Sequence, residues 1–91
     1  MASPLIAFVN RLETMKDWPD KLLITELTAF GETYIQSAYE ISHIIVARLI
    51  NASTNISYKL PMFYLIDSIM KNVGGPYAAL FGKVFLIYYT L

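Results

Sequence analysis

The stretch that decides the fold is residues 59–75, KLPMFYLIDSIMKNVGG. Pro61 suits the first turn of a helix, where its missing N–H would have no intrahelical acceptor. Gly74 suits the position after a helix, where a left-handed backbone closes the last turn. Almost every residue between them is apolar on every face, which is typical of a helix in the middle of a bundle. We therefore predict a central helix from about Tyr58 to Val73. Its single carboxylate, Asp67, needs a partner there, because an isolated buried charge is costly.

Two amphipathic helices are predicted before this central helix. Ser3 followed by Pro4 is a helix-start signal, and apolar residues then recur at three- and four-residue steps until Met15 or Lys16. Asp17 is the expected cap of the second helix. The buried stripe of that helix is predicted to be Leu23, Leu27, Phe30 and Tyr34. Its outer polar surface is predicted to hold Lys21, Thr25, Glu26 and Thr28. Gly31 is expected to weaken the last turn, which then frays.

A third helix and a fifth are predicted on either side of the central one. Ser37 and Glu40 match a capping box, and a polar loop over residues 51–57 follows this third helix. Its inward positions are predicted to be Ala38, Ile41, Ile45 and Leu49. Pro76 begins the fifth helix, whereas residues 84–91 are ambiguous between helix and strand. Short loops between amphipathic helices predict a single all-α domain over residues 1–91.

Composition excludes several function classes. Seven basic and seven acidic side chains cancel, so no overall charge draws this chain to nucleic acid or to an anionic membrane. The chain has no cysteine, and His43 is its only histidine, so a zinc site lacks ligands. No phosphate-binding loop or nucleophile motif occurs, and the apolar tail is shorter than the ~20 residues that span a bilayer. We expect no enzyme activity, no catalytic residues, no cofactor, no metal, no export signal and no membrane segment.

The central helix also resembles a known family. Residues 60–74, LPMFYLIDSIMKNVG, resemble the signature of the CTD-interacting domain, and the likeness is strongest to the domain found in pre-mRNA cleavage complex II. Residues 23–28 and 76–81 are compatible with the second and fifth helices of that family, so the resemblance covers about residues 8–83. The family often has an aromatic-Asn-Ser-Lys/Arg-Pro turn where this chain has Trp-Pro-Asp-Lys at 18–21.

This resemblance implies an architecture and a function. The family fold is a right-handed superhelical bundle of eight helices, similar to ENTH and VHS domains, with a peptide groove between the second, fourth and seventh. This chain has material for about five, so we expect a C-terminally truncated domain that self-associates through uncovered apolar faces. The family binds the phosphorylated C-terminal heptad-repeat tail of RNA polymerase II in the nucleus. It acts in pre-mRNA 3′-end cleavage and polyadenylation and in transcription termination. The implied partners are that repeat peptide, other cleavage and polyadenylation factors and, weakly, RNA, but no membrane.

The resemblance also implies site residues. Asp67 corresponds to an aspartate that accepts a hydrogen bond from the repeat's tyrosine hydroxyl; the alternative is an i,i+4 ion pair with Lys71. Tyr64 is a candidate wall for a proline ring, or else a core residue, and Lys71 is a candidate for drawing phosphate. Ser68 and Asn72 belong to the motif and either contact peptide or brace a neighbouring helix.

Two alternatives remain open. Lys21 stands where the family has a basic residue entering its second helix, and a solvated lysine is the other interpretation. A membrane-trafficking adaptor of the ENTH or VHS kind is the alternative function, because those bundles share a similar corner after their fourth helix. This chain lacks the basic cluster that phosphoinositide binding would use.

Overall fold

The computed structural model describes residues 3–52 and 56–90, with the side chains of all of these except Ile56 and residues 84–90. Within these ranges there are five α-helices, one short 3₁₀ helix and no strand, so the predicted all-α class is confirmed. The elements are α1 (Pro4–Leu12), α2 (Lys21–Thr33), the 3₁₀ helix η1 (Ile35–Ser37), α3 (Ala38–Asn51), α4 (Ile56–Asn72) and α5 (Pro76–Thr90).

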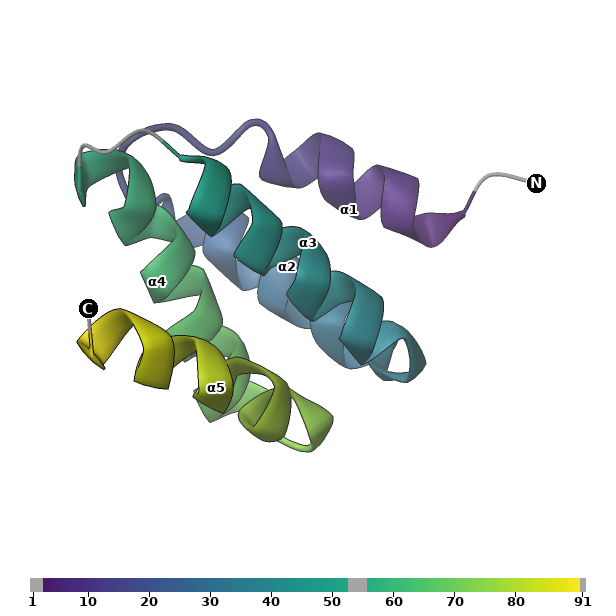
Figure 1. Cartoon of the computed structure of the whole chain (residues 1–91). Coiled ribbons are helices and arrows are strands. Elements are labelled where there is room, and N and C mark those ends of the chain that lie inside the picture. The colour runs from purple at the N-terminus through teal and green to yellow at the C-terminus, as the bar shows by residue number, and fades with distance from the viewer. Residues whose placement is uncertain (1–2, 53–55, 91) are drawn as a thin grey trace.

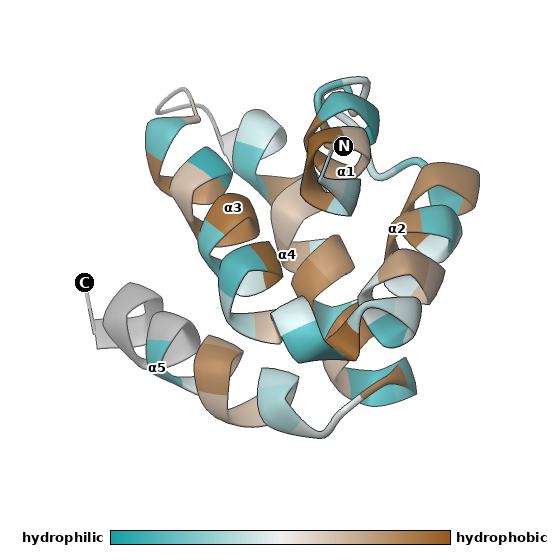
Figure 2. Cartoon of the chain, turned by 90° about the vertical axis from the view of Figure 1, so that its right-hand side faces the viewer, coloured by the Kyte–Doolittle hydropathy of each residue, from teal (hydrophilic) through white to brown (hydrophobic). Residues whose placement is uncertain are grey.

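Helix α4 lies at the centre of the arrangement. It contacts α2, α3 and α5, while α1 packs against α2 and α3. Figure 1 shows α1 and α5 on opposite sides of the bundle. In Figure 2, α4 lies between α2 and α3. The central position predicted for this helix is therefore confirmed.

One apolar cluster holds the helices together. The inward positions predicted for α3 are all buried, and α4 contributes four buried apolar side chains. The fully buried large residues are Phe8, Leu12, Leu27, Ile41, Ile45, Leu49, Met62, Leu65, Ile66, Ile69, Tyr77 and Phe81. Burial of a side chain of this size contributes about 1.5–3 kcal/mol, so this cluster is the main source of stability.

The ends of α1 and α2 differ from the prediction. Helix α1 ends at Leu12, earlier than expected, and the Thr14 hydroxyl donates to the Arg11 carbonyl at 2.6 Å in the turn that follows. Asp20, and not Asp17, caps α2 by accepting from the backbone N–H groups of its first turn at 3.1 and 3.2 Å. The reason is Pro19, because a residue before proline is disfavoured in the helical region and the helix begins only after it.

Three expectations around the end of α2 are wrong. The Ser37 side chain makes no cap hydrogen bond, and its N–H instead closes the η1 turn onto the Tyr34 carbonyl at 2.8 Å. Tyr34 is 39% exposed and lies past the last residue of α2, so the buried stripe stops short of it. Gly31 does not fray the helix, which continues to Thr33.

Helix α4 starts earlier and is less buried than its composition suggested. It begins at Ile56, so Pro61 lies inside the helix and not in its first turn. One side of α4 is exposed, with Leu60 and Tyr64 at 41% and 52% exposure, and Asp67 lies on this side. The expectation of a helix buried on every face is therefore wrong, because the long apolar run includes surface positions.

The corner after α4 follows the prediction. Gly74 has a φ of +70°, and its N–H donates to the Ile69 carbonyl at 3.1 Å. Pro76 begins α5, which continues to Thr90. Residues 84–90, which were ambiguous between helix and strand, are therefore helical. The predicted loop over 51–57 is shorter than expected, because α3 includes Asn51; residues 53–55 and Leu91 lie outside the described part.

Candidate functional site

The exposed side of α4 carries three of the predicted site residues at successive turns. Tyr64 is 52% exposed, and the Lys71 ammonium lies 3.1 Å from Oδ2 of Asp67. The side chains of this pair are 72% and 53% exposed, so the pair is solvated. Such an i,i+4 pair is worth about 0.3–0.5 kcal/mol, too little to explain the carboxylate on grounds of stability. Among the described residues, no group forms a hydrogen bond or ion pair with the other carboxylate oxygen of Asp67.

Ser68 and Asn72 take part in a directional chain of hydrogen bonds that begins in α2 and continues within α4. Thr28 Oγ1 donates to the Ile24 carbonyl at 2.7 Å and lies 2.7 Å from the Ser68 hydroxyl. A hydroxyl has one hydrogen, so Ser68 must be the donor in this second contact. The Asn72 amide then donates to the Ser68 carbonyl at 2.9 Å and more weakly to Ser68 Oγ at 3.3 Å. Ser68 therefore has the bracing role between helices that was left open for it, whereas the hydrogen bonds of Asn72 stay within α4.

Thr28, which contacts Ser68 between α2 and α4, is a residue that sequence reasoning missed. It was assigned to the outer polar surface of α2, yet it is only 8% exposed. Its bond to a carbonyl four residues back satisfies the hydroxyl, as threonines inside helices often do. The available signal was its spacing from Ile24 and Gly31, since residues three and four apart share a helix face and both neighbours are buried.

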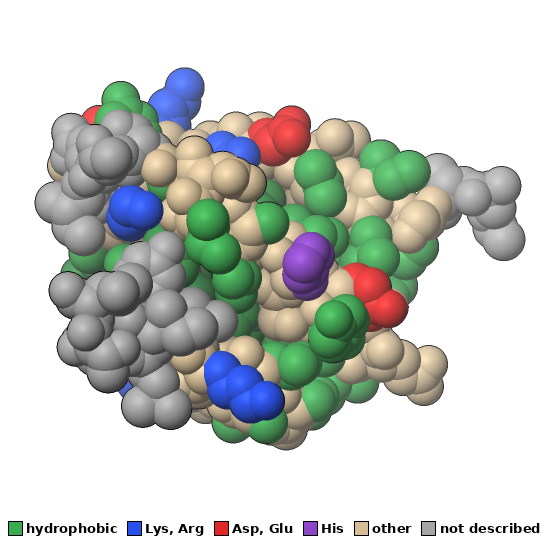
Figure 3. All heavy atoms as spheres, viewed as in Figure 1, with side chains coloured by type: hydrophobic (Ala, Val, Ile, Leu, Met, Phe, Trp, Pro, Cys, Tyr) green, Lys and Arg blue, Asp and Glu red, His purple; other side chains and the backbone are tan. Residues whose placement is uncertain are grey.

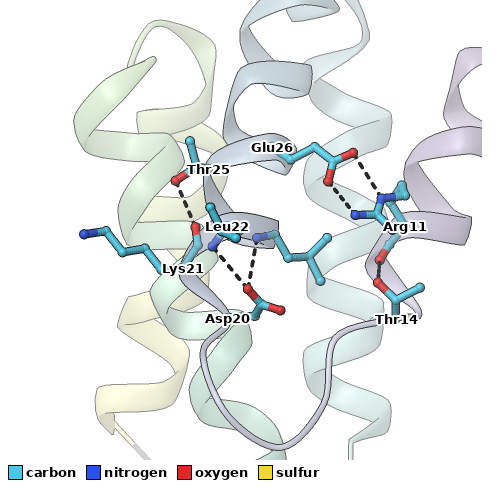
Figure 4. Close-up of polar contacts among 8 residues, drawn as sticks. Arg11, Thr14, Asp20, Lys21, Leu22, Thr25 and Glu26 are labelled. Carbon is cyan, nitrogen blue, oxygen red and sulfur yellow. Dashed lines mark hydrogen bonds and ion pairs between the residues drawn. The ribbon is translucent and has the colours of Figure 1, made fainter.

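Lys21 lies at the start of the same edge of α2. It is exposed, and its carbonyl accepts the Thr25 hydroxyl at 2.9 Å. Figure 4 shows its side chain extending to the side of α2 opposite the Arg11–Glu26 pair. Lys21, Thr25 and Thr28 follow at helical spacing, which aligns Lys21 with the edge that packs on α4. The structure therefore places five of the six predicted residues at exposed positions of α2 and α4, whereas Ser68 is half-buried between the two helices.

The other edge of α2 is closed by an ion pair to α1. Arg11 bonds both carboxylate oxygens of Glu26, at 3.1 and 2.6 Å. The hydrogen bond and charge of Arg11 hold the pKa of Glu26 below its ordinary value, and the same pair raises the pKa of Arg11. Because its guanidinium is committed to Glu26, Arg11 lies outside the candidate site.

A second feature is a pocket of about 350 Å³ whose lining includes Lys16, Arg48 and Tyr58. None of the six predicted site residues lines it. Sequence reasoning missed it because its walls come from three separate segments, and no local pattern signals that they meet.

Two further features of the chain bear on the class of protein. Within the described part of the chain, no three potential metal ligands gather in one place. None of the described helices has the length and apolar character needed to cross a bilayer. The fold and the site together define a small all-α domain in which a partly buried hydrogen bond joins α2 to α4, next to an exposed face of α4. No protein-family model matches the sequence.

Proposed function

We propose that this chain is a non-enzymatic peptide-binding module for the heptad-repeat tail of RNA polymerase II, acting in the nucleus in pre-mRNA 3′-end processing and transcription termination. The observation that carries the proposal is Asp67, a half-exposed carboxylate on the outer side of α4 with one oxygen that no described residue bonds. The sequence around it resembles the signature of the CTD-interacting domain.

The chemistry of Asp67 suits a tyrosine of the repeat. A hydroxyl donating to a carboxylate makes a charge-assisted hydrogen bond, which is about twice as strong as a neutral one. Lys71 holds Oδ2 and thereby orients the carboxylate, while the other oxygen can accept. A phenylalanine at the same place leaves this oxygen without a donor, so the contact discriminates between the two rings.

The neighbouring groups supply the remaining contacts of a peptide site. Tyr64, one turn before Asp67, presents a half-exposed ring against which a proline can pack. Lys21 and Lys71 are exposed cations on the two helices, and each can approach a phosphate as a point charge. The hydrogen-bond chain through Ser68 and Thr28 keeps α2 and α4 in fixed register, so these groups are held before the peptide arrives.

Peptide titration tests the proposal. Fluorescence anisotropy with a labelled two-repeat peptide, unphosphorylated or phosphorylated, compares the wild type with Asp67→Asn, which keeps the shape and removes the charge. Asparagine keeps an acceptor oxygen, so the charge-assisted hydrogen bond becomes a neutral one about half as strong, and we expect binding to weaken by about 1 kcal/mol, or roughly fivefold. Glu40→Gln, an exposed carboxylate of α3, is the matched control and should bind as the wild type does.

A peptide with phenylalanine in place of tyrosine completes the design. It should bind the wild type more weakly than the tyrosine peptide does, because a hydrogen bond to a charged group, worth about 1.5–3 kcal/mol, is lost, and Asp67→Asn should distinguish the two peptides less than the wild type does. Equal affinity of both peptides for the wild type would remove the tyrosine contact. Flotation with phosphoinositide vesicles in the absence of any peptide binding would replace the proposal by the membrane-adaptor function.

A further inference from the structure

The pocket at the corner where α3 ends and α4 begins has the size of a small-molecule site. Its volume of about 350 Å³ lies at the lower end of the ~300–1,000 Å³ typical of ligand pockets. Its walls are the turn after α1, the last turn of α3 and the first turns of α4. Three segments that the chain brings together only by folding therefore share one concave surface.

The pocket has an apolar floor and a polar rim. Met15 and Met62 line it and are 6% and 2% exposed, so they belong to the core and close its base. Tyr58 is 50% exposed and presents an aromatic ring at its edge. Lys16 is exposed, whereas Arg48 is half-buried.

The charge of the lining is entirely positive. Lys16 and Arg48 line the pocket and no acidic side chain does. Neither cation pairs with a carboxylate in the described part of the chain, in contrast to Arg11, which is bonded to both oxygens of Glu26. Figure 3 shows Lys and Arg side chains, in blue, around the upper left of the molecule, where α3 leads into α4.

The helix ends at this corner do not cancel that charge. The C-terminus of α3 carries about −0.5 of an elementary charge, and the N-terminus of α4 carries about +0.5. Because these two ends meet beside the pocket, their contributions oppose each other. The two side-chain cations remain as the dominant local charges, and half-buried Arg48 is screened by salt less than exposed Lys16.

We propose that this pocket binds a phosphate-bearing small molecule, independently of the peptide site. The planar guanidinium of Arg48 suits two phosphate oxygens at once, and Lys16 adds a second positive charge that matches a dianion. A water molecule takes about 30 Å³ in the liquid, so a bare phosphate ion leaves most of this volume unfilled. The remaining space, between the Tyr58 ring and the two methionines, accepts the organic part of the ligand.

Phenyl phosphate is the probe, because it joins the anion to an aromatic body. We expect its titration into the ¹⁵N-labelled chain at constant ionic strength to shift the amides of the last turn of α3 and the first turns of α4 saturably. Inorganic phosphate should bind at least fivefold more weakly, and phenol should give no saturable shift. The absence of saturable shifts with phenyl phosphate would overturn the proposal. Equal affinity for inorganic phosphate would overturn the assignment to an organic ligand.

Single substitutions distinguish binding in the pocket from nonspecific attraction to positive charge. Arg48→Gln and Lys16→Gln should each weaken phenyl phosphate at least fivefold, and Arg48→Lys should recover part of the affinity. Lys83→Gln removes one charge from an exposed lysine of α5 outside the lining and should bind as the wild type does. A loss as large for Lys83→Gln as for Lys16→Gln would show diffuse attraction and refute the site. Lys16 is exposed, so its variant stays informative even if Arg48→Gln unfolds.

Discussion

The hydroxyl of Tyr77 donates a hydrogen bond of 2.8 Å to the backbone carbonyl of Gly31, across 46 positions of the chain. Tyr77 lies in the first turn of α5 and is fully buried, while Gly31 lies in the last turn of α2. Carbonyls in the last turn of a helix have no intrahelical donor, so this hydroxyl supplies one. A Cβ at residue 31 would lie 3.3 Å from the hydroxyl oxygen, which explains the glycine by the close approach of the ring.

Removing this hydroxyl should destabilise the chain without disturbing its core. Tyr77→Phe keeps the buried ring but leaves a buried carbonyl without its donor, which costs about 1–3 kcal/mol. Urea denaturation followed by circular dichroism measures the free energy of unfolding. Tyr39→Phe, at a 68% exposed position, is the control and should change it by less than about 0.5 kcal/mol. Equal losses in both variants would contradict a specific role for the Gly31 contact.

Gly31→Ala should destabilise the chain even though alanine is the better helix former. Alanine gains about 1 kcal/mol of helix propensity, but its Cβ presses on a hydroxyl that the hydrogen bond holds in place. In the Tyr77→Phe background the nearest ring carbon would be 3.6 Å away, which is ordinary contact. The same substitution should then be neutral or stabilising. A double-mutant cycle from four denaturation curves measures this coupling, and strict additivity would disprove it.

Alkaline pH should weaken the fold through Tyr77. Burial raises the pKa of this phenol from 10.0 to about 12. Below pH 10 both the folded and the unfolded chain hold the proton, so the stabilisation is fully present there. Above pH 10 the unfolded state ionises first, and stability falls as pH rises towards 12. Denaturation curves between pH 9 and 12 should show a steeper loss for the wild type than for Tyr77→Phe, and parallel losses would exclude this cause.

Acidic pH should break the Arg11–Glu26 ion pair between α1 and α2. Arg11 lowers the pKa of Glu26, so the contribution of the pair is present above the ordinary glutamate pKa and is lost as pH falls through the lowered one. In Arg11→Gln, the Glu26 pKa measured by carboxyl ¹³C shifts should rise towards its ordinary value. Because both side chains are half-exposed, we expect only a small change in stability at pH 7. An unchanged Glu26 pKa in this variant would show that the pair does not persist in solution.

Ser68→Ala should separate bracing from peptide contact. The variant removes the donor to Thr28 Oγ1, which keeps its own bond to the Ile24 carbonyl, so we expect a loss of about 1 kcal/mol in stability. Peptide affinity should fall much less than it does for Asp67→Asn. Val73→Ala, a change at a partly buried position in the turn after the same helix, is a control for nonspecific loosening. A drop in affinity as large as that of Asp67→Asn would place Ser68 in direct contact with the peptide.

Much of the fold was predictable from interactions between residues close together in the sequence. The Ser3–Pro4 start, the Gly74 corner and the inward face of α3 were all predictable because capping, left-handed backbone and helical periodicity act within a few residues. The same local reasoning failed at Asp17, because Asp20 caps α2 in its place, and at Ser37, which precedes α3 but makes no side-chain cap hydrogen bond. It also overestimated the burial of α4, because an apolar residue can lie on either side of a helix whose neighbours are unknown.

The candidate site also has features that the sequence predicted and features that it did not. Asp67, Lys71 and Tyr64 share a face by spacing alone, so the sequence sufficed to group them. The bond between Thr28 and Ser68, the role of Gly31 and the pocket at Arg48 join residues far apart in the chain, so no local signal could reveal them.

The sequence by itself thus determined the all-α class of this chain, the approximate positions of most turns between its helices, and which polar residues share a face of α4. Only the tertiary structure decided that Asp67 faces solvent, that Thr28 and Ser68 brace two helices, and that a tyrosine of α5 completes α2. The physical reason is range: backbone preferences act over a few residues, whereas burial and long-range hydrogen bonds depend on which helices come to lie side by side.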